Sequence, residues 1–242
     1  WGSIGFFGPL SVRPDLWDQG IAQRLLEPVV DSFAARGVRH SGLFTFAQST
    51  KHLYLYQKFG FYPRFLTSLL SKSVVASEPI DGWSKWSDLL ESEQGTTLQL
   101  CREVTGAIYD GLDVSIEIWA IQEQHLGETV LLWNDSQLVG LACCQCGVGT
   151  EAGTDTCYIK FAAVLPGPTA ATSFDQLLQA CEALAVAQGL HRLVAGVNLG
   201  RQQAHQRLLA AGFCADMTGV AMEKPNEPGY NHDGVYLIDD WR

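Results

Sequence analysis

The residues best placed for chemistry lie in the stretch LSVRPDLWDQGIA, at positions 10–22. An apolar segment over residues 4–12 reads as a strand, Pro14 ends it, and Gly20 precedes a helical pattern. A strand that feeds a helix through such a loop presents unpaired N–H groups at the positive end of the helix dipole. These groups would bind an anion such as a pyrophosphate. An ordinary strand-to-helix turn that uses a glycine explains the same residues.

The helix that follows this loop needs a cap at its first turn. Asp15 or Asp18 is expected to supply it, because a short carboxylate accepts hydrogen bonds from free first-turn N–H groups. Gly20 has no side chain, so a ligand could approach the backbone closely there.

The composition narrows the class of protein. Hydrophobic residues make up 47% of the 242 residues and charged residues 17%, which predicts a globular chain with a sizeable core. A net charge of −10 argues against nonspecific nucleic-acid binding, and no apolar run is long enough to predict a membrane span. Seven cysteines without regular spacing favour reduced thiols and a cytoplasmic location. The chain begins at Trp1, inside the strand pattern, so we expect a longer source protein with an intact mass above 26.5 kDa.

Apolar periodicity and turn residues predict an alternation of strands and helices. The first helix contains Pro28, which predicts a kink, and ends at Gly37 as a left-handed cap. The predicted helices span residues 18–36, 51–59 (after a cap at Ser49 or Thr50), 89–108, 114–122, 174–188 and 201–211. The predicted strands span residues 1–12, 40–46, 61–74, 129–133, 137–146, 156–164, 192–197, 213–223 and 235–238, with a connector over 75–87.

The chain contains an internal repeat. When the sequence is shifted by 152 residues, two segments align without a gap, and the matched positions include Val12/Val164, Pro14/Pro166, Gly37/Gly189 and Phe61/Phe213. A unit of strand, proline, helix, glycine, strand, helix and Gly-Phe therefore occurs twice. The copies differ where chemistry would occur: Gly20, Ala22 and Tyr56 correspond to Thr172, Phe174 and Leu208. If the loop binds phosphate and the tyrosine moves a proton, only the first copy is competent.

Two motifs in the first copy resemble those of the GNAT superfamily of acyl-CoA-dependent N-acetyltransferases. Val12-Arg13-Pro14 followed by residues 17–22 (WDQGIA) is similar to the family's Gln/Arg-x-x-Gly-x-Gly/Ala loop after a Val-x-Pro strand end. Trp17 departs from the usual Gln or Arg. Residues 55–61 (LYQKFGF) match the family's Leu-Tyr-x-x-x-Gly-Phe signature, and Ser49 stands where an asparagine often precedes the tyrosine.

The resemblance implies an α/β fold with a GNAT-like mixed α+β sheet, in two tandem units. Residues 1–72 would be the C-terminal half of one GNAT domain, which lacks roughly 70 preceding residues by analogy with the second unit. A linker over 73–87 would lead to a second, degenerate GNAT-like domain over 88–228, followed by a C-terminal strand and tail over 229–242.

The resemblance also implies the site. Acetyl-CoA would place its pyrophosphate on the N–H groups of residues 18–22 and its pantetheine arm along residues 10–12, and Tyr56 would protonate the thiolate leaving group. A phenol is a better proton source than water for that task. The implied cofactor-binding residues are Leu10, Ser11, Val12, Trp17, Asp18, Gln19, Gly20, Ile21, Ala22, Ser49 and Tyr56. His40, His52 or an ordered water could take the proton of the amine.

The implied reaction is direct transfer of an acetyl group to an amine of a small molecule or peptide, with no nucleic-acid or membrane partner. Transfer to a hydroxyl or thiol, or transfer of a longer acyl group, stays open. A non-catalytic acyl-CoA-binding or scaffold protein is the alternative from another class, and the oligomeric state cannot be read from the sequence.

Two further features have competing explanations. Cys143, Cys144 and Cys146 include a Cys-x-x-Cys spacing, but a zinc ribbon needs a second pair, so we expect small buried thiols and no metal. Residues 236–242 (YLIDDWR) read either as a closing strand of the second domain or as a plug between domains or over a pocket.

Overall fold

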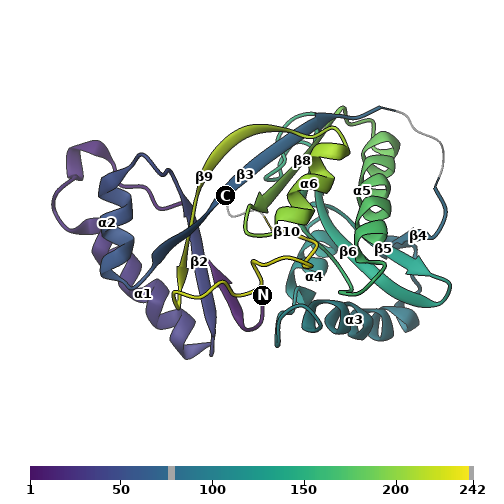
Figure 1. The fold of residues 1–242 in the computed structure, drawn as a ribbon, viewed down its shortest axis with the longest axis horizontal. Coiled ribbons are helices and arrows are strands. Elements are labelled where there is room, and N and C mark those ends of the chain that lie inside the picture. Colours follow the sequence, from purple (N-terminus) through teal and green to yellow (C-terminus); the bar gives the residue numbers. More distant parts are fainter. Residues whose placement is uncertain (76–79, 240–242) are drawn as a thin grey trace.

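One ten-stranded mixed sheet runs through the molecule in the computed structural model, which describes residues 1–75 and 80–239 (Figure 1). The strand order is β1-β2-β9-β3-β8-β7-β6-β5-β4, and β10 lies beside β7 off this path. The strands are β1 Ile4–Phe6, β2 His40–Thr45, β3 Tyr62–Ser73, β4 Trp83–Lys85, β5 Gly127–Asn134, β6 Gln137–Cys146, β7 Thr156–Val164, β8 Arg192–Asn198, β9 Cys214–Lys224 and β10 Leu237–Asp239. The α/β fold with a mixed sheet expected from the sequence is confirmed.

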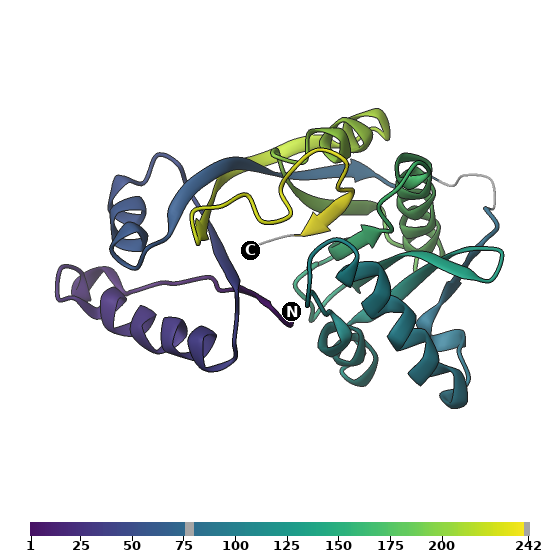
Figure 2. The same ribbon diagram turned by 60° about the horizontal axis from the view of Figure 1, so that its bottom comes forward.

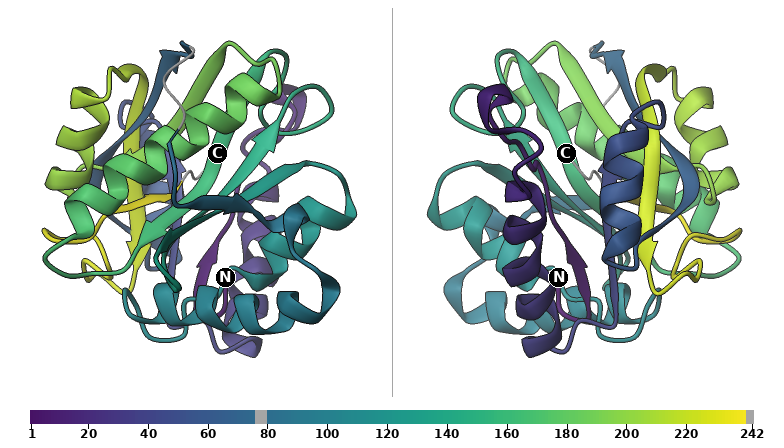
Figure 3. Two further views of the ribbon diagram at one scale, coloured as in Figure 1. Left: turned by 90° about the vertical axis from the view of Figure 1, so that its right-hand side faces the viewer. Right: turned by 90° about the vertical axis from the view of Figure 1, so that its left-hand side faces the viewer.

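The helices cover the sheet in three groups. Two short 3-10 turns, η1 Pro14–Leu16 and η2 Trp86–Asp88, accompany α1 Ile21–Ala35, α2 Thr50–Lys58, α3 Glu91–Gly106, α4 Ser115–Glu123, α5 Ala170–Ala187 and α6 Gln202–Ala210. The pair α1 and α2 lies at one end of the molecule and α5 lies toward the other (Figure 1), and Figure 3 shows α5 and α6 on one side of the sheet with α3 and α4 on the other. There α5 and α6 pack on one face of the sheet and α3 and α4 on the opposite face, each with its own apolar core.

The end of the molecule with α3, α4, α5 and α6 has two apolar cores, one on each face of the sheet. In the first core, Phe174 and Leu177 of α5 are fully buried against the sheet; in the second, Ile118 of α4 and Leu141 of β6 are fully buried. Each such side chain contributes about 1.5–3 kcal/mol when removed from water. A smaller third core lies under α1 and α2 and includes Leu26 and Phe61. Cys143 and Cys144 are fully buried, as expected of small apolar side chains, whereas Cys146, for which burial was also predicted, is only partly buried.

Most predicted elements are confirmed within three or four residues. The hairpin around Asp135, the left-handed cap at Gly37 (φ 68°) and the strand Thr156–Val164 are present as predicted. The helix predicted from residue 18 begins at Ile21, whereas the helix predicted from residue 174 begins at Ala170. α1 continues through Pro28.

Two predictions of local structure are wrong. The strand predicted over residues 1–12 is only Ile4–Phe6, because the chain diverges from β2 after Phe7 and no other strand among the described residues pairs with it. The connector predicted over 75–87 contains β4 and the start of η2, since Trp83 pairs with Leu132 of β5. Residues 76–79 of that connector lie outside the described part of the chain.

The strand registers follow the spacing of 152 residues. The parallel pairs Ile4↔His40 and Thr156↔Arg192 occupy corresponding positions. In the pair β3/β9, Thr67 lies opposite Gly219, the residue at its own repeated position. As a result, β9 lies between β2 and β3, while β3 lies between β9 and β8. The last strand of each aligned segment, β3 or β9, thus lies between the last two strands of the other.

Candidate functional site

The candidate site forms where the chain leaves the sheet after β1. Phe7 still donates its N–H to the carbonyl oxygen of Gly42 at 3.3 Å, and the following residues diverge from β2. The divergence opens a cavity of about 570 Å³ between the loop, the start of α1 and one side of α2. Its lining residues are Leu10, Ser11, Val12, Leu16, Trp17, Asp18, Gly20, Ile21, Ala22, Gln23, Ser49, Lys51, His52, Tyr54, Leu55 and Lys58.

The start of α1 opens into this cavity without a side-chain cap. Gly20 is the N-cap residue with a φ of 72°, and no atom lies within 4 Å of the position that a β-carbon would take there. No side chain hydrogen-bonds to the cap and no acidic residue lies in the first turn. Since the first N–H groups of a helix carry partial positive charge, this end is suited to an anion.

The predicted carboxylate cap is wrong. The carboxylate of Asp15 accepts hydrogen bonds from Arg13, at 3.1 Å from Nε and 2.5 Å from Nη2, so it is engaged before the helix begins. Asp18, with a φ of 61°, lies 3.6 Å from the ammonium of Lys51.

Two lysines give the cavity positive charge that sequence reasoning missed. Lys51 and Lys58 both lie on the side of α2 that faces the cavity, seven residues apart, which is two helical turns. The ammonium of Lys51 lies 5.8 Å from the ring centre of Trp17, and that of Lys58 lies 4.7 Å from the ring centre of Tyr54. The spacing of seven residues between Lys51 and Lys58, in the helix predicted after Ser49, was the sequence signal that could have revealed them.

Polar contacts fix two of the predicted site residues. The indole N–H of Trp17 donates to the carbonyl oxygen of Val12 at 2.8 Å, so the ring is held over the loop although it is exposed. The hydroxyl of Ser49 lies 2.9 Å from Nδ1 of His52.

Tyr56 lies beneath the cavity. It is buried in the small core, where its ring packs edge-on against Phe7 at 6.0 Å and lies 6.4 Å from the ring of His52. Burial raises the pKa of Tyr56, so its phenol stays protonated at neutral pH. Among the described residues, Tyr56 and Gln19 are the two predicted site residues that do not line the cavity.

The two candidate bases lie in different environments. His52 lines the cavity. His40, at the start of β2, is buried with its Nε2 3.6 Å from the carboxylate of Glu223. The structure therefore brings His52, and not His40, together with the predicted cofactor-binding residues.

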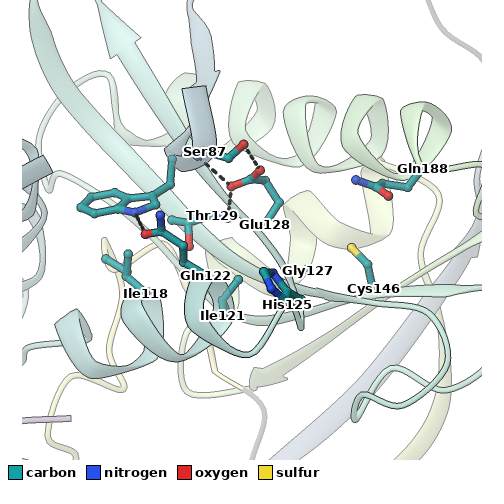
Figure 4. Close-up of a pocket in the computed structure, with 11 residues that line it drawn as sticks. Ser87, Ile118, Ile121, Gln122, His125, Gly127, Glu128, Thr129, Cys146 and Gln188 are labelled. Atoms are coloured by element: carbon teal, nitrogen blue, oxygen red, sulfur yellow. Dashed lines mark hydrogen bonds between the residues drawn. The ribbon is translucent and has the colours of Figure 1, made fainter. Parts of the chain in front are cut away.

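A second cavity of about 410 Å³ lies at the start of β5 (Figure 4). Its most polar lining residue is Glu128, whose carboxylate accepts hydrogen bonds from Ser87 Oγ at 2.5 Å and from the N–H groups of Ser87 and Thr129. Gln122 likewise accepts a hydrogen bond from the Trp86 indole. These hydrogen bonds join η2 and α4 to the sheet. The polar groups of this cavity therefore have a structural role.

Comparison with known proteins finds a family match over the first quarter of the chain. Residues 1–61 match the model of the acetyltransferase (GNAT) family. Over this segment the chain is similar to the GNAT superfamily. The match covers the site loop, α1, α2 and the Gly60-Phe61 pair. A search by sequence among curated proteins finds no match.

Solved GNAT structures share the fold at low sequence identity. A putative acetyltransferase from Pyrococcus horikoshii has a TM-score of 0.67 at 12% identity, covering all of this chain and 73% of that one. A GCN5-related N-acetyltransferase from Sphaerobacter thermophilus has a TM-score of 0.57 at 16% identity, covering 88% of this chain and 70% of that one. A GNAT-family acetyltransferase from Colwellia psychrerythraea has a TM-score of 0.53 at 11% identity, covering 88% and 75%. In the described part of the chain, no helix has the length and apolar character needed to cross a bilayer.

Proposed function

We propose that this protein is an acetyl-CoA-dependent N-acetyltransferase of the GNAT superfamily that uses the cavity at the start of α1. The observation that carries the proposal is the uncapped first turn of α1 behind Gly20, which faces a cavity bearing two lysines. A helix start of this kind binds phosphate oxygens through its N–H groups. The family match over the same residues supports acyl transfer as the chemistry.

The residues present fit acetyl-CoA in three parts. The pyrophosphate would be held by the N–H groups of residues 18–22, and Lys51 and Lys58 would add charge for the phosphates. The indole of Trp17 offers a flat, exposed face to an aromatic base. The free edge at Leu10, Ser11 and Val12 would receive the pantetheine arm, with Ser49 nearby.

The chain itself would supply proton transfer. Acetyl-CoA provides a thioester: the amine nitrogen bonds to its acetyl carbon, and the carbon–sulfur bond breaks. Tyr56 would give its phenolic proton to the sulfur, since its raised pKa keeps that proton in place at neutral pH. His52 has access to the cavity and would receive the proton that the amine loses, directly or through water.

Tyr56→Phe tests the proposal, with Tyr62→Phe on the exposed start of β3 as its control. We expect Tyr56→Phe to lower kcat about 100-fold with a panel of small amines and peptides, while coenzyme A binding by calorimetry stays unchanged. Unchanged turnover would remove Tyr56 from the mechanism.

A non-catalytic acyl-CoA-binding or scaffold protein is the second candidate. The observation that favours it is the packing of Tyr56 inside the small core instead of on the cavity wall. Tight acetyl-CoA binding without turnover of any acceptor would support this candidate over the enzyme.

We further propose the division into units 1–72 and 88–228, the second a degenerate copy, with 73–87 as the link and 229–242 as a terminal strand and tail. Its support is the set of strand registers that follow the spacing of 152 residues. Seven free cysteines support a reducing compartment such as the cytoplasm.

A further inference from the structure

A strand of this chain fills the gap in the second copy that corresponds to the candidate cofactor cleft of the first. In the second copy, β7 and β8 pair in parallel only as far as Ile159 and Ala195, and then separate. The strand β10 lies in the opening: Leu237 pairs with Ala163 and Ile238 with Ala162, and β10 also contacts β8. Figure 2 shows β10 near the middle of the molecule.

The edge that β10 covers is the counterpart of the predicted pantetheine edge. A shift of 152 residues places Leu10, Ser11 and Val12 on Ala162, Ala163 and Val164. In the second copy, the N–H of Val164 donates to the carbonyl oxygen of Tyr236 at 3.3 Å. In the first copy, Val12 lines the open cavity. The backbone edge that is available to a ligand in one copy is therefore paired with β10 in the other.

Two residues that change between the copies contact this strand or the residue before it, and a third shares a core with it. Phe174, at the position of Ala22, packs its ring against Tyr236 at 5.5 Å. Arg201, at the position of Ser49, pairs with the carboxylate of Asp239. A third change, Tyr56 to Leu208, puts an apolar side chain into the core that contains Ile238. All three substitutions thus suit a cleft filled by protein instead of by a charged ligand.

The phosphate loop is also closed in the second copy. α5 begins at Ala170, three positions earlier than α1 when the copies are aligned, so Thr172 is inside the helix where Gly20 precedes it. A helical turn therefore takes the place of the open loop.

A buried polar network closes the end of the strand. Arg201 and Asp239 are both fully buried, Tyr230 donates its hydroxyl to Asp239 at 2.7 Å, and Asn231 accepts from Arg201 at 2.5 Å. Burial and the neighbouring carboxylate raise the pKa of Tyr230, which keeps it a donor. Because a buried charge needs a partner, the arginine of the second copy requires Asp239 in place.

We propose that β10 is a built-in occupant of the second copy's cofactor cleft, so that each chain has one site for an acyl-CoA. That the first cleft takes this ligand rests on the proposed function; that β10 fills the second does not. The second copy then contributes its sheet and helices to the fold but no chemistry of its own.

Amide exchange at two matched valines tests the proposal in the full chain labelled with 15N-valine. Without ligand, we expect the N–H of Val164 to exchange at least about 100-fold more slowly than that of Val12, since one is paired with β10 and the other borders the cavity. Coenzyme A should slow exchange at Val12 only and bind with one equivalent per chain by calorimetry. Equal exchange at the two valines, or slowing at Val164 by coenzyme A, would overturn the proposal.

The same experiment separates this inference from the proposed function. If coenzyme A slows amide exchange at neither valine while Val164 is protected without it, the proposed function fails. The inference that β10 fills the second cleft then still holds. Asp239→Asn should raise the exchange rate of Val164 at least about tenfold, whereas Asp175→Asn, which removes an exposed ion pair with Arg207, should not. If Asp239→Asn fails to fold, the comparison of the two valines in the unaltered chain still decides.

Discussion

The buried ion pair between Arg201 and Asp239 should produce a large loss of stability when one partner is removed. Both groups are fully buried, and the carboxylate also accepts a hydrogen bond from Tyr230. Replacing Asp239 with alanine leaves an uncompensated buried guanidinium, which typically costs about 3–5 kcal/mol. Loss of the tyrosine hydrogen bond adds about 1 kcal/mol.

For a chain of this size, each 1 kcal/mol lowers Tm by roughly 2–4 °C, so Asp239→Ala should lower it by about 8–24 °C. Thermal unfolding followed by circular dichroism measures this shift. Asp175→Ala is the matched control, because Arg207 lies on α6, the helix that Arg201 caps, but the side chains of its pair with Asp175 are 45% and 39% exposed. Exposed pairs contribute about 0–1 kcal/mol, which predicts a shift of no more than about 4 °C. Similar shifts in Tm for the two variants would refute the inference that the ion pair with Arg201 holds β10 in the core.

Four other results are expected. Lys58→Ala should weaken coenzyme A binding about 2–5-fold at low salt and less at high salt, whereas Arg36→Ala at the other end of α1 should not; equal effects would contradict a phosphate role for the lysine. Ala22→Phe, which copies the second unit, should abolish coenzyme A binding in calorimetry with Tm little changed. Burial raises the pKa of Tyr56 above its usual 10.0, so kcat should stay constant up to pH 10 and fall only at higher pH, as the phenol ionises. A pH profile of kcat measures this, and a decline near pH 8 would contradict the role of Tyr56. Cys214 is exposed and should give one fast-reacting thiol with Ellman's reagent, and several fast thiols would show that the buried cysteines are accessible.

The local elements were predictable because their signals are local. Helix-ending glycines such as Gly37 and the alternation of apolar residues in β7 fixed most boundaries within a few residues. The loop that lines the cavity could be singled out for the same reason, since Gly20 and its neighbours are contiguous in sequence. Lys51 and Lys58 of α2 were missed because the motif comparison considered only Ser49 and Tyr56 in this region. The two lysines nevertheless lie on one face of the helix.

Long-range pairing could not be read from the sequence. The strand predicted over residues 1–12 shortened to Ile4–Phe6 because the partner strand diverges, and divergence is a property of the whole sheet. β4 was missed because its three residues are a strand only through pairing with β5. The position of β10 depended on contacts between Asp239 and Arg201, 38 residues apart, for which no pattern in either segment gives a signal.

The position of β9 between β2 and β3 has a consequence for synthesis on the ribosome. β2 and β3 each pair with β9. This part of the sheet can therefore form only after β9 has been made, about 150 residues after β3 ends. At roughly 5–20 residues per second, that interval is about 8–30 s. During this time the facing edges of β2 and β3 are open strands, which are prone to pair with other chains. A nascent-chain chaperone that shields apolar strand edges would therefore affect the yield of this protein more than its final stability.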